Sequence, residues 1–419
     1  MVDHDTKPAK SFSKFSKPST VIMSNIHIPP TVDISEAWTS PEARKAIAAQ
    51  IRQVATEEGY FYVTGHRVPE TVSSNLLRQI QHFFEDLPQE KKNTLRGKFG
   101  FGYESVGYTS AEGDRETKEA FNFGYEEAID AHADERIVVK KEDGSVAQFV
   151  KNAWPEEKDL PGFFDAMKAY YSGVFDLTML LVKLYAISLD LPEDAFDHLT
   201  TRRQLSGRLM YYPPAKNPKP LDPNERANEV GMGAHSDYQV ITVNNTSLGG
   251  LEVLTNEGRW VSVPNKEGAL IVNGGDFLSR CTNDLYKSPV HRVCNRSGTT
   301  CRTSIPIFFT FNYDDEIGVC ARLLLWNSRS DLDQVFPSFI SEKNPAKYPP
   351  VTTAEYIVER VKWTTKAEAE KAILLRRNQQ LTEEWENVKS PICDDPERAK
   401  LFDESQKRKL AAIGLIVAN

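Results

Sequence analysis

Two histidines and one aspartate have the types and spacing of a shared metal site. His235-Ser236-Asp237 begins a predicted strand, and residues two apart on a strand point to the same face. His291 follows 54 residues after Asp237, in a second strand-like segment at 290–294. Two histidines and one carboxylate leave three coordination positions open, which suits a non-haem iron(II) that binds a co-substrate and dioxygen together. A structural zinc site would instead be closed by four protein ligands, usually including cysteine.

A second polar pair, Arg302 and Ser304, comes eleven residues after His291 and also lies on one face of a predicted strand. The planar guanidinium of Arg302 fits a carboxylate bidentately, and Ser304 adds a hydroxyl. If 2-oxoglutarate chelates the iron through its keto acid end, its far carboxylate needs such a clamp. Tyr212, in MYYPP, can add a phenolic donor from a neighbouring strand.

The ordered set of motifs is more specific than its parts, because H-x-D alone is weak. The chain contains its own decoy, His132-Ala133-Asp134, in a charged segment without a strand pattern. The decoy has no histidine at a comparable downstream spacing, and Arg302-Thr303-Ser304 is the one R-x-S in the chain. The iron interpretation therefore rests on residues 235–304.

The elements that must position these residues begin at about residue 205. Short β-rich segments then recur between Gly, Asn and Pro turns, which indicates a jelly roll or a sandwich. Upstream, we predict short strands at 32–38 and 59–66. Helices are predicted at 41–57, at 69–86 and between 160 and 191, and the chain becomes helical again beyond about 354.

These patterns divide the chain into four parts. Residues 1–27 are a predicted disordered tail, and 28–200 are an N-terminal region of helices and strands. Residues 201–350 are the predicted catalytic β-core, and 351–419 are a C-terminal helical extension. The expected fold class is therefore α+β with a mainly β core, flanked by N-terminal and C-terminal helices.

Composition restricts the partners. The net charge of −8 disfavours a general attraction to nucleic acid or to an anionic membrane. We find no uninterrupted apolar run near the roughly 20 residues that span a bilayer. The five cysteines form no C-x-x-C pair, a pattern of free thiols in a reducing compartment. A soluble, cytoplasmic protein is expected.

The chain resembles the isopenicillin N synthase-like superfamily of 2-oxoglutarate/iron(II) oxygenases over about residues 28–365. The resemblance implies a double-stranded β-helix core, with His235, Asp237 and His291 as iron ligands. It also implies that Arg302 and Ser304, assisted by Tyr212, hold 2-oxoglutarate, and that dioxygen is the oxidant. The matching stretches are GYFYVTGH, HFFEDLPQEKK, KEAFNFG, RLMYYPP, GAHSDYQVITV, GGLEVL, GRWVSVP, GALIVNGGDFLSRCTNDLYKSPVHRV and RTSIPIFF.

The implied substrate is a small, largely apolar molecule, such as a secondary metabolite or its precursor, with a nucleobase as an alternative. Hydroxylation, desaturation and ring rearrangement are all compatible with the motifs. In the family, the segment that matches the aromatic run 101–125 lies near the pocket mouth. Arg208 either faces a substrate anion or forms a structural salt bridge. The aromatic candidates for substrate contact are Tyr103, Tyr108, Phe121 and Phe123.

Two departures from the family pattern stand out. Met210 occupies the position where many plant members carry Asn, so one polar contact near the co-substrate is absent or replaced. The stretch beyond about residue 365 is longer than the family core requires. This stretch has two possible roles: it forms a lid, or it forms a self-association surface that gives a homodimer through the C-terminal helices.

Two other functions remain open from the sequence. An iron(II) oxidase of the isopenicillin N synthase or ACC oxidase type would use the same R-x-S motif without 2-oxoglutarate. A non-catalytic jelly roll that binds a small molecule would not need three open metal positions. A dioxygenase forms succinate in a reaction that depends on 2-oxoglutarate, whereas the oxidase does not. Iron binding distinguishes a dioxygenase from the non-catalytic jelly roll.

Overall fold

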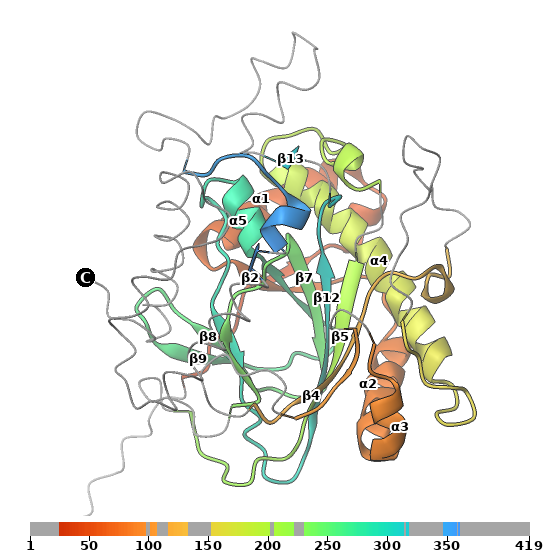
Figure 1. Cartoon of the computed structure of the whole chain (residues 1–419). Helices are drawn as coiled ribbons and strands as arrows, with labels where there is room; N and C mark the ends of the chain where they lie inside the picture. Colours follow the sequence, from red (N-terminus) through yellow and green to blue (C-terminus); the bar gives the residue numbers. More distant parts are fainter. Residues whose placement is uncertain are drawn as a thin grey trace, which may run out of the picture.

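A computed structural model of the 419-residue chain describes residues 25–97, 101–106, 116–132, 152–201, 205–221, 230–313, 316–317, 347–357 and 359–360. Within these residues, two facing β-sheets form the core and helices cover the outer face of the larger sheet (Figure 1). The architecture is the expected double-stranded β-helix, α+β with a mainly β core.

The larger sheet has eight strands in the order β1-β2-β10-β7-β12-β5-β4-β3. Strands β1 and β2 pair in parallel, and the other pairs of this sheet are antiparallel. Its strands are β1 (Thr31–Asp33), β2 (Tyr60–Thr64), β3 (Gly102–Glu104), β4 (Glu119–Phe123), β5 (Leu205–Tyr212), β7 (Ile241–Thr246), β10 (Leu270–Gly274) and β12 (Arg302–Phe309).

The smaller sheet is antiparallel and runs in the order β6-β11-β8-β9. A separate two-stranded pair joins β13 and β14. Alternating side chains of the two main sheets meet in an apolar layer that includes Met210, Leu251 and Val293. The remaining strands are β6 (Met232–His235), β8 (Leu251–Leu254), β9 (Trp260–Val263), β11 (His291–Val293), β13 (Glu316–Ile317) and β14 (Val351–Thr352).

Three long helices confirm the helical predictions upstream of the β-core. In α1, the Ser40 hydroxyl accepts the Ala43 N–H at 3.1 Å and Pro41 occupies the first turn, so the helix begins where the sequence predicts. The helices are α1 (Pro41–Glu57), α2 (Glu70–Glu85), α3 (Gln89–Thr94), α4 (Phe163–Ser188) and α5 (Asp276–Cys281), with 3₁₀ turns η1 (Ser35–Trp38), η2 (Glu127–Ile129) and η4 (Asp197–Leu199).

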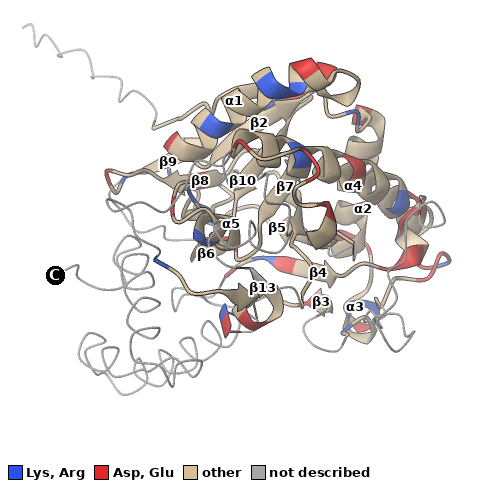
Figure 2. Ribbon diagram, turned by 90° about the horizontal axis from the view of Figure 1, so that it is seen from above, with Lys and Arg blue, Asp and Glu red and all other residues tan. Residues whose placement is uncertain are grey.

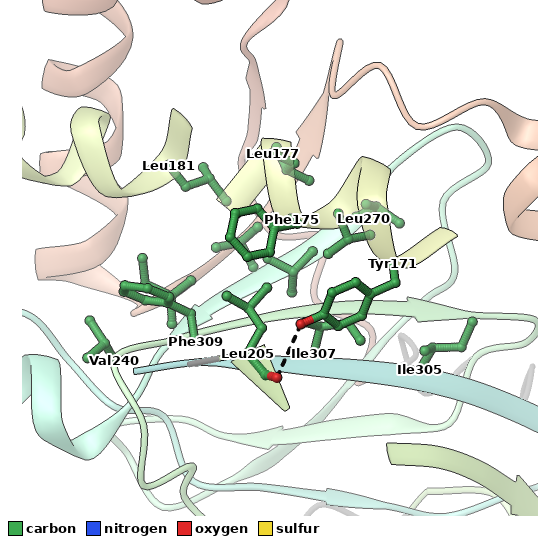
Figure 3. Close-up of a cluster of buried hydrophobic side chains, with 14 of the residues drawn as sticks. Tyr171, Phe175, Leu177, Leu181, Leu205, Val240, Leu270, Ile305, Ile307 and Phe309 are labelled. Atoms are coloured by element: carbon green, nitrogen blue, oxygen red, sulfur yellow. Dashed lines mark hydrogen bonds between the residues drawn. The ribbon is translucent and has the colours of Figure 1, made fainter. Parts of the chain in front are cut away.

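Helix α4 is long and apolar enough to cross a membrane by length and composition alone. Most of its apolar residues are buried inside the protein, where Tyr171, Phe175 and Leu181 lie over strand residues such as Leu205 and Ile307 (Figure 3). The Tyr171 hydroxyl donates to the Leu205 carbonyl at 3.3 Å. Burial against the sheet accounts for the composition of α4.

In Figure 2, charged positions of α1 lie on the outside of the molecule, whereas β7 and β10 carry none.

Some predictions were wrong or lie elsewhere. The strand predicted at 32–38 ends at Asp33, because the Asp33 carboxylate accepts the Ser35 N–H at 2.9 Å and turns the chain into η1. The short helix α5 was not predicted. The described residues include neither residues 1–24 of the predicted tail nor residues 361–419 of the C-terminal extension. The homodimer and the four-part division of the chain therefore stay predictions.

Candidate active site

The three candidate metal ligands come together on the inner side of the smaller sheet. His235 ends β6 and lies directly opposite His291, which begins β11, and the two ring centroids are 4.3 Å apart. The Asp237 Oδ1 atom lies 3.8 Å from the Nε2 atom of each histidine. One ligand atom from each residue falls within 4.8 Å of the others, a separation that a single ion can bridge.

Backbone carbonyls set the orientation of both imidazoles. The Nδ1 atom of His235 lies 2.8 Å from the Gly233 carbonyl oxygen, and Nδ1 of His291 lies 3.1 Å from that of Pro289. A carbonyl can only accept, so each Nδ1 carries the proton and each Nε2 offers its lone pair. Both lone pairs are therefore available on the side that faces Asp237.

The Asp237 carboxylate is held by the opposite sheet. Its Oδ2 atom accepts the Thr242 hydroxyl at 2.6 Å and the Asn273 amide at 2.8 Å, which leaves Oδ1 facing the histidines. The predicted strand beginning at His235 was wrong, because β6 ends there and Asp237 lies in the connection to β7. The two side chains converge because this connection crosses between the sheets, where the Asp237 carbonyl accepts the Asp276 N–H at 2.7 Å.

The electrostatics favour the forms that bind a cation. Burial, and then the neighbouring His291, lower the pKa of His235 to about 4, so its imidazole is neutral at pH 7. Burial opposes ionisation of Asp237, but His291 and His235 outweigh it and lower the pKa of that carboxyl. A buried carboxylate faced by the Nε2 atoms of two imidazoles is a donor set that fits iron(II).

Arg302 is a fully buried guanidinium with no carboxylate partner among the described residues. Its Nε donates to the carbonyl oxygens of Leu248 and Gly249, and its Nη1 donates to the Ser304 hydroxyl at 3.0 Å. The Nη2 atom is buried and has no hydrogen-bond partner in the part of the chain that the structure describes. The Tyr212 ring lies 5.0 Å from the guanidinium carbon. Burial lowers the pKa of Arg302 and raises that of Tyr212. A buried cation with an unused donor fits an anionic ligand.

A pocket of about 630 Å³, counting its open mouth, lies between the two sheets. Both histidines and Asp237 line it, as do Ser304 and Tyr212, whereas Arg302 lies just behind them. Most of the other lining residues are apolar: Met210, Met232, Leu251, Val253, Ile271, Pro289, Val293, Pro306 and Phe308. The rest of the lining carries polar groups, from Tyr60, Arg208, Thr242, Asn244 and Asn273. This mixture is typical of a site for a small organic molecule.

Arg208 lines the pocket and also forms the ion pair that was considered for it. Its Nη2 donates to Glu104 Oε2 at 2.7 Å and its Nε to Asn122 Oδ1 at 2.6 Å. Lys118 donates to the other oxygen of Glu104 at 2.6 Å. Burial opposes ionisation of Glu104, but Arg208 and Lys118 outweigh it and lower its pKa to about 2. Glu104 is therefore a carboxylate at any physiological pH.

Three aromatic candidates for substrate contact lie on the other side of the larger sheet. Phe121 and Phe123 alternate with pocket-side Asn122 on β4, so they pack beneath the helices, where Phe121 is 5.4 Å from the Phe83 ring. Tyr103 pairs with Phe121 in register, shares that face, and hydrogen-bonds to Glu119. Tyr108 lies outside the described residues.

Four residues that support the site were not predicted from the sequence. Thr242 and Asn273 anchor Asp237, and Glu104 and Asn122 hold Arg208. Strand alternation contained the signal for Asn122, since it must face away from Phe121 and Phe123. The pairing that brings β4 beside β5 is long-range, and no local pattern predicts it.

Comparison with known families places this geometry in context. Residues 205–311 match the model of the 2OG-Fe(II) oxygenase superfamily, and residues 29–157 match the model of the N-terminal region of non-haem dioxygenases described for morphine synthesis. The first match contains all three candidate metal ligands together with Arg302 and Ser304. The two matches together include both the β-core and the region of α1 and α2.

Individual relatives agree. The chain is 32% identical to the 2-oxoglutarate-Fe(II) type oxidoreductase ppzC of Metarhizium majus, over 73% of this chain and 83% of that protein. It is 32% identical to the oxidoreductase hxnY of Emericella nidulans, over 78% and 88%. The structure of a Neurospora crassa protein in complex with alpha-KG and thymine shares the fold, with a TM-score of 0.63 at 22% identity over 82% of this chain and 99% of that one. The chain belongs to the 2-oxoglutarate/iron(II)-dependent dioxygenase superfamily.

Proposed function

We propose that this pocket is the active site of a dioxygenase that hydroxylates or desaturates a small organic molecule, with iron(II) held by His235, Asp237 and His291. The Nε2 atoms of both histidines and the Asp237 Oδ1 atom support this assignment, because they present three ligand atoms to one point. When bound, iron with 2-oxoglutarate and dioxygen supplies the oxidising power of this family.

We further propose that Arg302, Ser304 and Tyr212 hold the far carboxylate of 2-oxoglutarate. The observation that carries this assignment is the buried Nη2 of Arg302, which has no hydrogen-bond partner in the described structure. A buried cation without a counter-charge is costly, and a bound carboxylate would remove that cost. The adjacent Ser304 and Tyr212 hydroxyls line the pocket, so a ligand there can reach both.

The remaining pocket residues define what the protein contributes beyond the iron. The apolar wall, including Met210, Val253 and Phe308, excludes water from the reacting carbon and orients an apolar substrate. Thr242 and Asn273 keep the Asp237 carboxylate ionised and fixed. We propose a substrate from secondary metabolism; the names of the relatives, 2-oxoglutarate-Fe(II) type oxidoreductases, support the reaction class.

Succinate formation tests the proposal. We expect the iron(II)-loaded protein to convert 2-oxoglutarate into succinate in the presence of oxygen, slowly without substrate and faster with it. An Arg302→Ala variant should need a much higher concentration of 2-oxoglutarate for the same rate. Oxygen consumption without any dependence on 2-oxoglutarate would instead favour the oxidase alternative.

A further inference from the structure

Two arginines near the pocket have surroundings that differ in charge: Arg208 lines the pocket, whereas Arg302 lies just behind Ser304 and Tyr212. Arg302 has no carboxylate partner, whereas Arg208 is paired with Glu104, both within the described residues. The Arg208 cluster also contains Lys118 and Glu116, whose charged atoms are 3.2 Å apart. Among the described residues, this cluster has two cations and two carboxylates. Because Arg208 already has a carboxylate partner and Arg302 has none among these residues, an anionic ligand gains less beside Arg208 than beside Arg302.

Arg208 nevertheless keeps donors for a ligand. A guanidinium has five N–H groups, and Arg208 uses one on Nε for Asn122 and one on Nη2 for Glu104. Its Nη1 forms no hydrogen bond with any residue that the structure describes, and the side chain, about a fifth exposed, lines the pocket. The two fixed contacts hold the guanidinium plane in one orientation, which lowers the entropic cost of binding an acceptor.

The position of Arg208 relative to the metal ligands suits a substrate contact. Arg208 lies on β5, and Thr242, which anchors Asp237, lies on β7 with only β12 between them. Two strand spacings separate these backbones by roughly 10 Å. The contacts with Asn122 of β4 and Glu104 of β3 turn the Arg208 guanidinium away from β12, so the space between it and the metal ligands is at least this wide and has room for a molecule of one or two rings. Pro306 and Phe308 of β12 provide an apolar floor between the two ends.

We propose that Arg208 is the polar anchor of the substrate, and that it selects a neutral molecule with a carbonyl oxygen, such as an amide or lactam, over a carboxylate. This inference rests on the proposed function, because it assigns the remaining end of the same pocket. The neutral acceptor satisfies Nη1 without disturbing the ion pair with Glu104. Of the two partners considered for Arg208, a substrate anion and a salt-bridge carboxylate, Glu104 provides the second.

Benzamide and benzoate test this selectivity, because they have nearly the same shape and differ in charge. Dissociation constants are measured by calorimetry without oxygen, on the full chain loaded with iron(II) and 2-oxoglutarate, so that no turnover occurs. We expect wild type to bind benzamide roughly tenfold or more tightly than benzoate, since a hydrogen bond to a charged group is at stake. A preference for benzoate, or no binding of benzamide at millimolar concentrations, overturns the proposal.

Three variants separate the role of Arg208 from general loss of folding. Glu104→Gln removes the counter-charge and is expected to shift the preference toward benzoate. The double variant Glu104→Gln/Arg208→Met keeps one cation and one carboxylate in the cluster and is expected to lose the benzamide preference. Arg208→Lys keeps the charge without the planar fork and is expected to retain part of it. Unchanged benzamide affinity in the double variant contradicts the proposal.

The affinity for 2-oxoglutarate distinguishes failure of this inference from failure of the proposed function. If wild type forms no complex with iron(II) and 2-oxoglutarate, the proposed function is wrong, and this inference falls with it. If wild type binds 2-oxoglutarate but the double variant loses that binding, Arg208 belongs to the co-substrate site. The substrate-anchor assignment is then overturned, whereas the proposed function stands.

Discussion

At the scale of single residues, hydrogen bonds within the protein use some polar atoms of each candidate ligand side chain and leave the others for a ligand. Nδ1 of each histidine is used by a backbone carbonyl, and Oδ2 of Asp237 is used by Thr242 and Asn273. The atoms left over are the ones that a metal requires. Likewise, Nη2 of Arg302 has no hydrogen-bond partner among the described residues and can donate to an anion.

Replacement of Asp237 by alanine removes the one carboxylate of the donor set. We expect Asp237→Ala to abolish succinate formation and to lower iron binding at least about tenfold, because two imidazoles without the carboxylate hold the cation weakly. Metal content after gel filtration and the succinate assay check this. Asp86→Ala, at an exposed position, is the control and should behave as wild type. Full activity in Asp237→Ala would refute the ligand assignment.

Glu104 gives a pH dependence with a defined sign. Its pKa is about 2 in the folded protein and 4.5 in the reference state, so the unfolded chain binds more protons between these values. The stability contributed by the ionised form is therefore complete above pH 4.5 and is lost as the pH falls toward 2. We expect Glu104→Gln to unfold at a lower temperature than wild type at pH 7, by an amount that shrinks as the pH falls below 4.5. A difference that does not change with pH would contradict the shifted pKa.

At the scale of elements, a short segment near residue 360 supports the connection that carries Asp237. The Arg360 guanidinium pairs with Asp276 at 2.9 Å, and both side chains are buried. Asp276, which begins α5, also accepts the Ser236 hydroxyl at 3.0 Å and donates its N–H to the Asp237 carbonyl. The residue that precedes Asp276, Gly275, allows this approach, since an added Cβ would lie 2.1 Å from the Gln239 carbonyl oxygen.

Loss of Arg360 should therefore affect both folding and the metal site. We expect Arg360→Ala to cost about 3 kcal/mol or more in free energy of unfolding, because it leaves Asp276 buried with one partner fewer. Iron affinity should fall as well, since the connection from β6 to β7 loses its support. Arg52→Ala breaks a largely exposed ion pair with Asp190 and should cost less than about 1 kcal/mol. Chemical denaturation and iron titration of both variants provide the comparison, and equal losses would argue against a special role for Arg360.

At the scale of the whole molecule, local sequence patterns predicted helices, ordered motifs predicted the candidate metal ligands, and neither predicted how distant strands pair. Helix α1 was predicted to the residue, because Ser40 and Pro41 mark its start and an apolar stripe marks its length. The convergence of the candidate metal ligands followed from their spacing, although Asp237 proved to lie between strands. The larger sheet unites strands from residues 31–33 to 302–309, and such long-range pairing decides which face of β4 meets the pocket. For that reason the sequence offered Phe121 and Phe123 as candidates for substrate contact although they pack in the core, and Asn122 and Glu104 were missed.

The central claim is that one pocket binds iron(II) through His235, Asp237 and His291 and binds 2-oxoglutarate through Arg302. The most direct measurement is an anaerobic titration of the iron(II)-loaded protein with 2-oxoglutarate, followed by the weak visible charge-transfer absorption of the chelate, on wild type and Arg302→Ala. We predict a band that saturates in wild type and that needs at least about tenfold more 2-oxoglutarate in the variant. Iron binding without any such band in wild type would contradict the account.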